Sequence, residues 1–389
     1  MYNRTNHQKK AGNDMSRQFR IFVINPGSTS TKVSLFLDET CQFSSDVFHD
    51  SAMLRKYPTI NDQLDFRMEV IEKFLKDNRI DLTGIDAIVG RGGSCCSVRS
   101  GIYAINDLLI KDTREAKGGL YHSSMLGVQL AKEFQKRYGG IMLMMDPPVV
   151  DELCDLARMT GVKGIYRRAV SHALNLKATA KHHAETIGKR YEDCNFIVCH
   201  IDGGISITAH CRGRMIDGND AGGGEGPYTP TRMGSMAVTD IARHLPDCTA
   251  QRLKDLCSQA GGFSSWFNTS DSNRIYAMAE AGDAQAARVW DGMIYQVIKY
   301  IGAMSTVLKG DVDGIVLTGG LLRFPDVEQK IRESCGWIAP VTSYPGEFEQ
   351  EAMAAGALAV LRHEVTPAVY TGTPVWNGFP DQHPETGHE

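Results

Sequence analysis

The stretch RIFVINPGSTSTKVSLFLDE, residues 20–39, joins two apolar runs through a bend of small and polar residues. Ile21–Ile24 and Val33–Leu37 have the composition of two buried β-strands, and Lys32 ends the bend. Because Gly27 lacks a Cβ atom, the bend can place backbone amides, hydroxyls and one ammonium group around a single point. This set of groups suits an anion such as a phosphate. For one hairpin alone, an exposed turn made of turn-forming residues is the simpler interpretation.

The second half of the chain repeats this pattern. NFIVCHIDGGISITAHCRGRMID, residues 195–217, is again an apolar run, a glycine-containing turn and a run that alternates with period two. A further buried strand, Ile315–Thr318, ends on Gly319 and Gly320. One such hairpin in each half of the chain is the mark of a duplicated domain. The three glycine-bearing strand ends together predict two jaws that grip phosphates and a third edge that admits an adenosine.

Strands alternate with helical patterns along the chain, which predicts an α/β fold. Residues 85–90 (IDAIVG) and 141–145 (IMLMM) have the apolar composition of buried strands. The spacing of apolar residues predicts helices at four places: residues 70–76, 122–137, 171–191 and 347–364.

The predicted organisation has two domains, at residues 20–190 and 191–365. Residues 1–19 are polar and are predicted to form a disordered tail, and residues 366–389 a C-terminal tail rich in Thr, Gly and Pro. Because the first strand begins only near Arg20, Met15 is a candidate for the native start of the chain.

Composition excludes several classes of function. The chain of 389 residues is 42% hydrophobic and 23% charged with a formal net charge of -4, as in soluble globular proteins. A nucleic-acid partner would require a basic patch, and a membrane span a much longer apolar run. The ten cysteines contain no C-x-x-C pair, and the N-terminus has no apolar signal region. These features favour thiols in a reducing cytoplasm over disulfides or a zinc site.

Nine motifs follow one another between about Phe22 and Leu361: INPGSTSTK, VGRGG, YHSSMLG, MDPPVVDE, RRAVSHALNLKA, HIDGGISITAHCRGRMID, GEGPYTPTRMGSM, VLTGGL and YPGEFEQEAMAAGAL. In this order they resemble the motifs of the butyrate kinases, within the acetate kinase family. The resemblance implies two duplicated ribonuclease H-like domains of the actin-like ATPase superfamily, with a nucleotide cleft between them.

The resemblance implies a Mg²⁺-dependent, reversible transfer of the γ-phosphoryl group of ATP to butyrate, giving butyryl phosphate and ADP. A carboxylic acid with a pKa of about 5 is ionised at neutral pH, so the reaction needs no general base. Its difficulty is electrostatic, because one anion must approach another. Catalysis is therefore expected to depend on positioning and on cations around the transferred group.

The catalytic residues implied by the resemblance meet this demand. Arg91 and Arg232 match the two arginines that bind the substrate carboxylate and the phosphoryl oxygens. Arginine suits this role because its guanidinium is planar, bidentate and always charged. His172 matches a histidine that donates to the phosphoryl group, and His122 another histidine near it. After Arg232 the chain has Met233 and Gly234 where the family has Ser-Gly, which weakens the local match.

Two acidic residues are implied as metal ligands. Asp146 follows a strand, where a carboxylate can position Mg²⁺ or its waters. Glu349 matches a second acidic residue near the metal, although Glu347 and Glu351 are close enough to leave the register open.

Eleven residues are predicted to bind the nucleotide. They are Asn25, Gly27, Ser28, Ser30 and Lys32 in the first jaw, His200, Asp202, Gly203 and Gly204 in the second, and Gly319 and Gly320 at the third strand end. Asp202 stands where the family has glycine, and a carboxylate beside ATP phosphates repels them unless it binds the metal or faces away. Small residues at Gly92, Gly93 and Ser171 predict room for an acid longer than acetate.

Alternative interpretations remain open at this point. Another short- or branched-chain acid kinase, for acetate, propionate or isobutyrate, would share the catalytic residues and differ only in the acyl pocket. An ATP-binding module on the same fold could lack productive transfer. A scaffold protein would explain neither the paired arginines nor the aspartate at a strand end. The resemblance further implies a homodimer and metabolic coupling to an acyl-CoA phosphotransferase.

Overall fold

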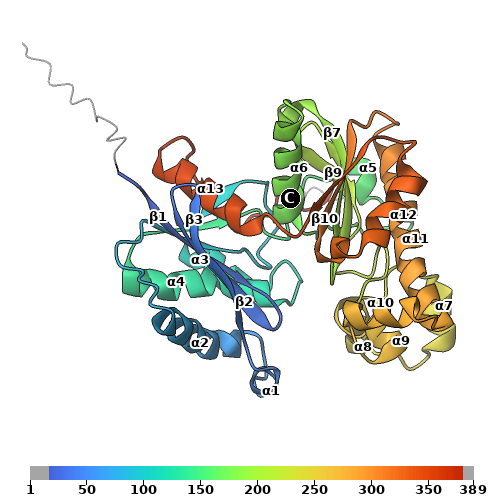
Figure 1. Cartoon of the computed structure of the whole chain (residues 1–389), viewed down its shortest axis with the longest axis horizontal. Coiled ribbons are helices and arrows are strands. Elements are labelled where there is room, and N and C mark those ends of the chain that lie inside the picture. The colour runs from blue at the N-terminus through green and yellow to red at the C-terminus, as the bar shows by residue number, and fades with distance from the viewer. Residues whose placement is uncertain (1–16, 380–389) are drawn as a thin grey trace, which may run out of the picture.

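The computed structural model describes residues 17–379 and shows two lobes, each built around one β-sheet with helices on both faces (Figure 1). Residues 1–16, which include Met15 and most of the predicted N-terminal tail, lie outside the described residues. So do residues 380–389 of the predicted C-terminal tail. Within the described part of the chain, no helix combines the length and the apolar character needed to cross a membrane.

The sheet of the first lobe has seven strands in the order β12-β5-β6-β4-β1-β2-β3. The first three strands form an antiparallel meander, and β4 and β6 then add in parallel next to β1. The strands are β1 (Arg20–Pro26), β2 (Ser30–Leu37), β3 (Thr40–Phe48), β4 (Ala87–Gly90), β5 (Ile102–Ala104), β6 (Ile141–Met145) and β12 (Ala368–Val369).

The sheet of the second lobe has five strands in the order β11-β10-β7-β8-β9. It repeats the first: an antiparallel meander is again followed by two strands that add in parallel. The strands are β7 (Asn195–Ile201), β8 (Ile205–Cys211), β9 (Arg214–Gly218), β10 (Gly314–Gly319) and β11 (Val341–Pro345). The duplication predicted from the two hairpins is therefore present in the fold.

Helices cover the sheets and form a small helical subdomain below the second sheet (Figure 1). The α-helices are α1 (Ser51–Leu54), α2 (Leu64–Asp77), α3 (Asp107–Arg114), α4 (Gly127–Tyr138), α5 (Asp155–Arg158), α6 (Ala173–Thr186), α7 (Val238–His244), α8 (Ala250–Ser258), α9 (Phe263–Phe267), α10 (Ser272–Glu280), α11 (Ala284–Val307), α12 (Pro325–Cys335) and α13 (Glu349–Leu361). Short 3₁₀ turns occur at Asn61–Gln63, Ser123–Leu126, Tyr191–Asp193 and Gly320–Arg323.

Two helices cross between the lobes, so the predicted boundary at residues 190 and 191 does not divide the packing. Helix α6 belongs to the first half of the chain but packs on β7 and β10 of the second sheet. Helix α13 belongs to the second half but packs on β1, β4 and β6 of the first sheet (Figure 1). The two helices also contact each other. The sequence predicts both helices, but neither apolar pattern specifies which sheet the helix covers.

Within the C-terminal tail predicted from residue 366, residues 368–379 pack against the first lobe. β12 adds in parallel to β5, and the buried Tyr370 donates its hydroxyl to Asp112 at 2.8 Å. The Val375 amide bonds the Ser97 carbonyl at 3.1 Å. The sequence does not predict the structure of this segment, because the segment contains polar residues and proline. It is held by a few tertiary hydrogen bonds and not by a local pattern.

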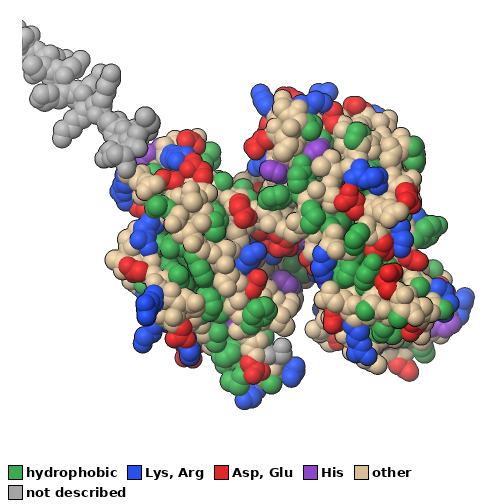
Figure 2. All heavy atoms as spheres, in the orientation of Figure 1, with side chains coloured by type: hydrophobic (Ala, Val, Ile, Leu, Met, Phe, Trp, Pro, Cys, Tyr) green, Lys and Arg blue, Asp and Glu red, His purple; other side chains and the backbone are tan. Residues whose placement is uncertain are grey.

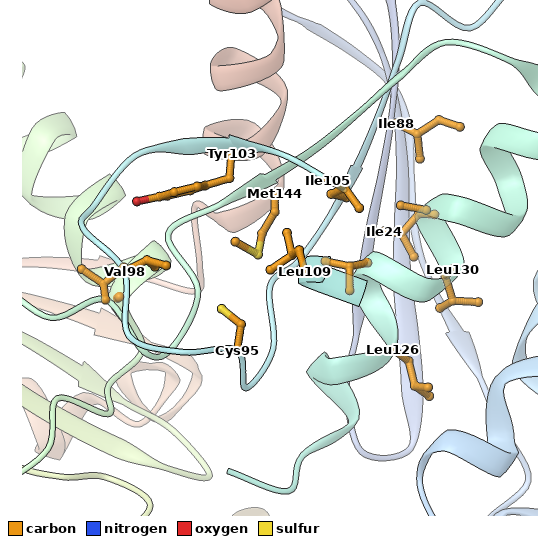
Figure 3. Packing of buried hydrophobic residues seen from close by; sticks show 14 of the residues in the cluster. Ile24, Ile88, Cys95, Val98, Tyr103, Ile105, Leu109, Leu126, Leu130 and Met144 are labelled. Carbon is orange, nitrogen blue, oxygen red and sulfur yellow. The ribbon is translucent and has the colours of Figure 1, made fainter. Parts of the chain in front are cut away.

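The inner strand β1 is buried on both faces, which explains its nearly continuous apolar sequence. Phe22 and Ile24 face the core cluster under α2 and α4, whereas Ile21 and Val23 face α13. Figure 3 shows part of the first of these clusters, with Ile24, Leu126 and Leu130 among its labelled residues. The ends of the strands that carry the predicted site are therefore held by packing on both sides.

Candidate active site

The two hairpin tips lie at the ends of β1 and β7, which are inner strands of the two sheets. A cleft separates the two lobes, and charged and histidine side chains gather in it (Figure 2). In open α/β sheets, ligands bind beyond the carboxyl ends of the parallel strands. β1, β4, β7 and β10 end on this cleft with Pro26, Gly90, Ile201 and Gly319.

The first hairpin tip turns its carbonyls into the protein. The Gly27 amide bonds the Ser30 carbonyl at 2.8 Å and closes the turn. From helix α2, the Arg67 guanidinium donates to the carbonyls of Gly27 at 2.8 Å and Ser28 at 3.0 Å. Among the described residues, the amides of Ser28 and Thr29 have no intramolecular acceptor. They remain available for an anion at the tip.

The second hairpin tip is held from two sides. Thr229 and Thr231 donate their hydroxyls to the Gly203 carbonyl at 2.7 and 3.0 Å. On the other side, Asp202 accepts hydrogen bonds from the amides of Gly203 at 2.7 Å and Gly320 at 2.8 Å. Asp202 therefore joins the second jaw to the third strand end, which the sequence did not indicate.

The third strand end depends on glycine for close packing. Gly319 has φ +110°, and a Cβ atom there would lie 2.4 Å from the Ile201 carbonyl oxygen. A Cβ atom on Gly320 would lie 2.6 Å from the Asp202 carboxylate. The predicted residues Gly203, Gly319 and Gly320 thus meet in one place at the edge of the second sheet.

Arg91, the residue after β4, lies at the centre of a buried network. Its guanidinium contacts Glu349 at 2.9 Å and donates to the side-chain carbonyl of Asn25 at 3.2 Å. The Asn25 amide in turn donates to Glu349 at 2.6 Å. Burial raises the pKa of Glu349, while the charge of Arg91 favours the ionised form. Asn25, Arg91 and Glu349, predicted separately from three motifs, are therefore one unit at the base of α13.

Arg232 lies against the second hairpin. Its guanidinium donates to the Ala221 carbonyl at 2.5 Å. A Cβ atom on Gly204 would lie 2.6 to 2.9 Å from three atoms of this guanidinium, so only glycine leaves room for it. Burial lowers the pKa of Arg232, although the group stays charged at neutral pH. One arginine thus stands at each jaw of the cleft.

Three histidines share the cleft with the two arginines. The rings of His172 and His200 stack with centroids 4.0 Å apart, and His172 Nδ1 contacts Ser206 Oγ at 2.8 Å. Burial first, and then neighbouring charges that include Arg91 and Arg232, hold the pKa of His172 well below its usual range. The same causes lower the pKa of His122 to about 3. Both side chains are therefore neutral at physiological pH.

The hydrogen bonds around Asn175 fix the tautomer of His200. The Phe348 amide can only donate, so the atom it contacts at 3.3 Å is the Asn175 oxygen. The Asn175 nitrogen then donates to His200 Nδ1 at 2.7 Å. It also donates to Thr318 Oγ1 at 3.3 Å. The Thr318 hydroxyl donates its own proton to the Gly346 carbonyl. Neutral His200 therefore carries its proton on Nε2 and is a hydrogen-bond donor on that side.

The acidic residues divide into two groups. Asp146 lies at the end of β6 with φ +37° and accepts bonds from Ser100 Oγ at 2.7 Å and the Gly101 amide at 2.8 Å. Burial raises its pKa. No hydrogen bond or ion pair among the described residues joins it to Arg91 or Glu349. A separate cluster brings ligand atoms of His200, Asp202 and Glu347 within 4.8 Å of one another.

Gly92 and Gly93 do not provide the space that the sequence suggested. A Cβ atom on Gly92 would lie 2.6 Å from the Met144 sulfur, and one on Gly93 would lie 2.4 Å from the Met125 backbone. These glycines permit close packing of the loop after β4 and leave no room for an acyl chain. Ser171 does line a small cavity, which also has the apolar wall residues Val150, Leu153, Val170 and Met215.

Two residues of this site, Arg67 and Asn175, were not predicted from the sequence. Arg67 sits in a helix between acidic positions and has the pattern of a surface residue. Asn175 follows His172 by three positions on the same helix face, which was an available signal. Of the three acidic residues that the sequence offers near the metal, Glu347, Glu349 and Glu351, it is Glu347 that lies in the cluster with Asp202.

The sequence is similar to those of known proteins of one enzyme family. Residues 156–333 match the acetokinase family. "Probable butyrate kinase" of Clostridium botulinum (strain Alaska E43 / Type E3) is 39% identical over 354 residues, which cover 90% of this chain and 99% of that protein. "Probable butyrate kinase 2" of Caldanaerobacter subterraneus subsp. tengcongensis is 41% identical over 354 residues, with the same two coverages.

The fold is similar to the folds of solved kinase structures. The acetate kinase of Porphyromonas gingivalis superposes with a TM-score of 0.68 at 17% identity, covering 88% of this chain and 99% of that one. A propionate kinase from Francisella tularensis gives 0.68 at 15% identity, covering 87% and 98%. At these identities the likeness concerns the fold alone, and it confirms the predicted two-domain α/β fold.

Proposed function

Because the chain belongs to the acetokinase family, we propose that it is a short-chain carboxylic acid kinase, most directly a butyrate kinase. The predicted family resemblance is confirmed by relatives that are 39 and 41% identical over 90% of the chain. The reaction is the reversible transfer of the γ-phosphoryl group of ATP to butyrate. The observation that carries the proposal is that one arginine stands at each of two duplicated phosphate hairpins.

The two arginines solve the electrostatic difficulty of the reaction. The acid arrives as an anion and needs no base, so the site must reduce repulsion between it and the terminal phosphate. Arg232 lies against Gly204, where it can contact the phosphoryl oxygens. Arg91 is held by Glu349 and Asn25, which fix its orientation before the substrate arrives. Guanidinium groups in fixed positions lower the barrier without reorganising during transfer.

The histidines can act as neutral hydrogen-bond donors. His200 presents Nε2–H because Asn175 occupies Nδ1. His172 stacks on His200 and contacts Ser206 with Nδ1, which leaves Nε2 for the transferred group. At His122 the Ser124 amide donates to Nδ1 at 3.2 Å, so this neutral ring also carries its proton on Nε2. Such donors can stabilise charge on the phosphoryl oxygens without proton transfer.

A magnesium ion fits the acidic residues of the cleft. Mg²⁺ prefers oxygen ligands, keeps several waters and uses one or two carboxylates. Glu347 offers a carboxylate in this cluster, and Glu349 is a second candidate in contact with Arg91. Both oxygens of Asp202 already accept backbone amides. Asp146, the other metal ligand implied by the family, is engaged by Ser100 and Gly101. When bound, the ion would neutralise charge on the phosphates.

The family resemblance supports further features of the protein. We propose a homodimer, a cytoplasmic location and metabolic coupling to an acyl-CoA phosphotransferase. We also propose two domains with the chain boundary near residue 190, with α6 and α13 exchanged between them. Light scattering after gel filtration tests the dimer.

The proposal is tested by trapping the product. Purified enzyme is incubated with ATP, Mg²⁺ and each acid from acetate to valerate, and hydroxylamine converts any acyl phosphate to a hydroxamate. We expect the highest kcat/KM with butyrate or a branched acid of similar size, with overlap between neighbours because a buried methylene contributes only about 0.8 kcal/mol. Nucleotide binding without hydroxamate for any acid would favour an ATP-binding module. Acetate as the best substrate would contradict the assignment among the acids.

A further inference from the structure

Arg67 is a buried arginine beneath the first phosphate hairpin. It projects from α2 and is 1% exposed. Besides the carbonyls of Gly27 and Ser28, it contacts the Ser30 carbonyl at 3.3 Å and Thr31 Oγ1 at 3.4 Å. Its Nε and second Nη donate to the Gln63 side chain at 3.2 and 3.1 Å. All three nitrogens of the guanidinium therefore donate hydrogen bonds, and most of these bonds hold the hairpin tip.

All of these acceptors are neutral. Within the described residues no carboxylate forms an ion pair with Arg67, and burial alone lowers its pKa, to about 10. The side chain thus carries a full positive charge at neutral pH. Its charge reaches the site, because it helps to lower the pKa of His49 and of His122. Proteins normally pair a buried charge, since its desolvation is costly.

The second hairpin shows that holding the tip does not require a charge. There, the hydroxyls of Thr229 and Thr231 hold the Gly203 carbonyl. Neutral donors thus perform in the second jaw what Arg67 performs in the first. The charge of Arg67 is therefore in excess of what the turn needs, and the adjacent jaw is where an anion would offset it.

We propose that Arg67 is a positioning residue for the polyphosphate, which supplies its missing counter-charge. The guanidinium binds the tip carbonyls, while the amides of Ser28 and Thr29 have no acceptor among the described residues. The field of the guanidinium favours phosphates over the neutral part of the nucleotide. This inference rests on the proposed function, since it requires that a nucleotide binds between the hairpins.

The test compares ATP with adenosine, which lacks the phosphates. Isothermal titration calorimetry with Mg²⁺ present measures both dissociation constants for the parent enzyme, Arg67→Gln and Arg67→Lys. We expect Arg67→Gln to weaken ATP binding roughly tenfold or more while adenosine binding changes less than about twofold. Arg67→Lys keeps the charge and loses the planar fork, so we expect an intermediate effect on ATP.

Lys73→Gln is the matched control, because Lys73 lies on the same helix, its side chain is 76% exposed, and Asp77 is its only ion-pair partner among residues 17–379. It should leave both dissociation constants unchanged. If Arg67→Gln does not fold, Arg67→Lys alone decides through the ratio of ATP to adenosine affinity. A variant that loses ATP and adenosine affinity equally, or neither, overturns the inference and leaves Arg67 a structural clamp. Failure of the parent enzyme to bind ATP would instead refute the proposed function.

Discussion

Replacing Asp202 with glycine separates three roles for a carboxylate that stands beside the predicted phosphate site. The side chain could be a bystander, a metal ligand or a brace. The structure favours a brace, because its two oxygens accept the amides of Gly203 at 2.7 Å and Gly320 at 2.8 Å. Asp202→Gly removes both bonds and frees two amides at the point where the second jaw meets the third strand end.

The expected magnitude follows from these two bonds. A hydrogen bond to a charged group contributes about 1.5–3 kcal/mol when buried. Asp202 is half-buried and water can reach the freed amides, so we discount this to about 1 kcal/mol per bond and about 2 kcal/mol in total. For a domain of this size, such a loss lowers the melting temperature by about 4–8 °C.

Thermal unfolding and steady-state kinetics measure the two effects together. We expect the lower melting temperature with kcat within about threefold of the parent enzyme and an unchanged or lower KM for ATP, because the freed amides can bind phosphate. Asp202→Asn keeps one acceptor oxygen, so its loss in the free energy of unfolding should be about half of that expected for Asp202→Gly. An unchanged melting temperature with kcat reduced roughly a hundredfold, and with a higher Mg²⁺ requirement, would refute this reasoning and identify a metal ligand.

Three further perturbations test other parts of the site. Asn175→Asp cannot donate to His200 Nδ1, so ¹⁵N NMR of labelled histidine should show the proton move to Nδ1 and kcat should fall; an unchanged tautomer contradicts this. The added Cβ atom of Gly204→Ala displaces the Arg232 guanidinium, so kcat should fall about tenfold or more. The melting temperature should stay unchanged. An unaltered kcat would place Arg232 outside the reaction. Burial lowers the pKa of His49 to about 4, whereas the unfolded chain binds this proton near pH 6.5. The unfolded state therefore binds more protons in this range, so the melting temperature should fall as the pH drops from 7 to 5. His49→Gln should reduce that pH dependence.

The fold was largely predictable because its decisive features are local. The hairpins at residues 20–37 and 195–211 show apolar runs, turn residues and period-two alternation within one short window. The crossing of α6 and α13 could not be predicted, since an apolar helix pattern does not identify the sheet that it covers. The ordered segment at 368–379 depends on single tertiary bonds such as that of Tyr370 to Asp112.

The sequence singles out candidate residues of the site by their chemistry, but not the contacts among them. Asn25, Arg91 and Glu349 come from distant motifs, and the structure brings them together at one place. The reason for a glycine was harder to predict: Gly92 accommodates Met144 and leaves no acyl space. Arg67 could not be found, because burial of a charged residue in an amphipathic helix is visible only in the folded protein.

The central claim is that two hairpins from duplicated halves hold a triphosphate while Arg91 and Arg232 bring a carboxylate to its terminal phosphorus. A crystal structure with a non-hydrolysable ATP analogue, Mg²⁺ and butyrate tests it most directly. We expect phosphates between the tips at Ser28 and Gly203, with both guanidinium groups against the γ-phosphate and the acid. Phosphates bound elsewhere, with the two tips open to solvent, would contradict it.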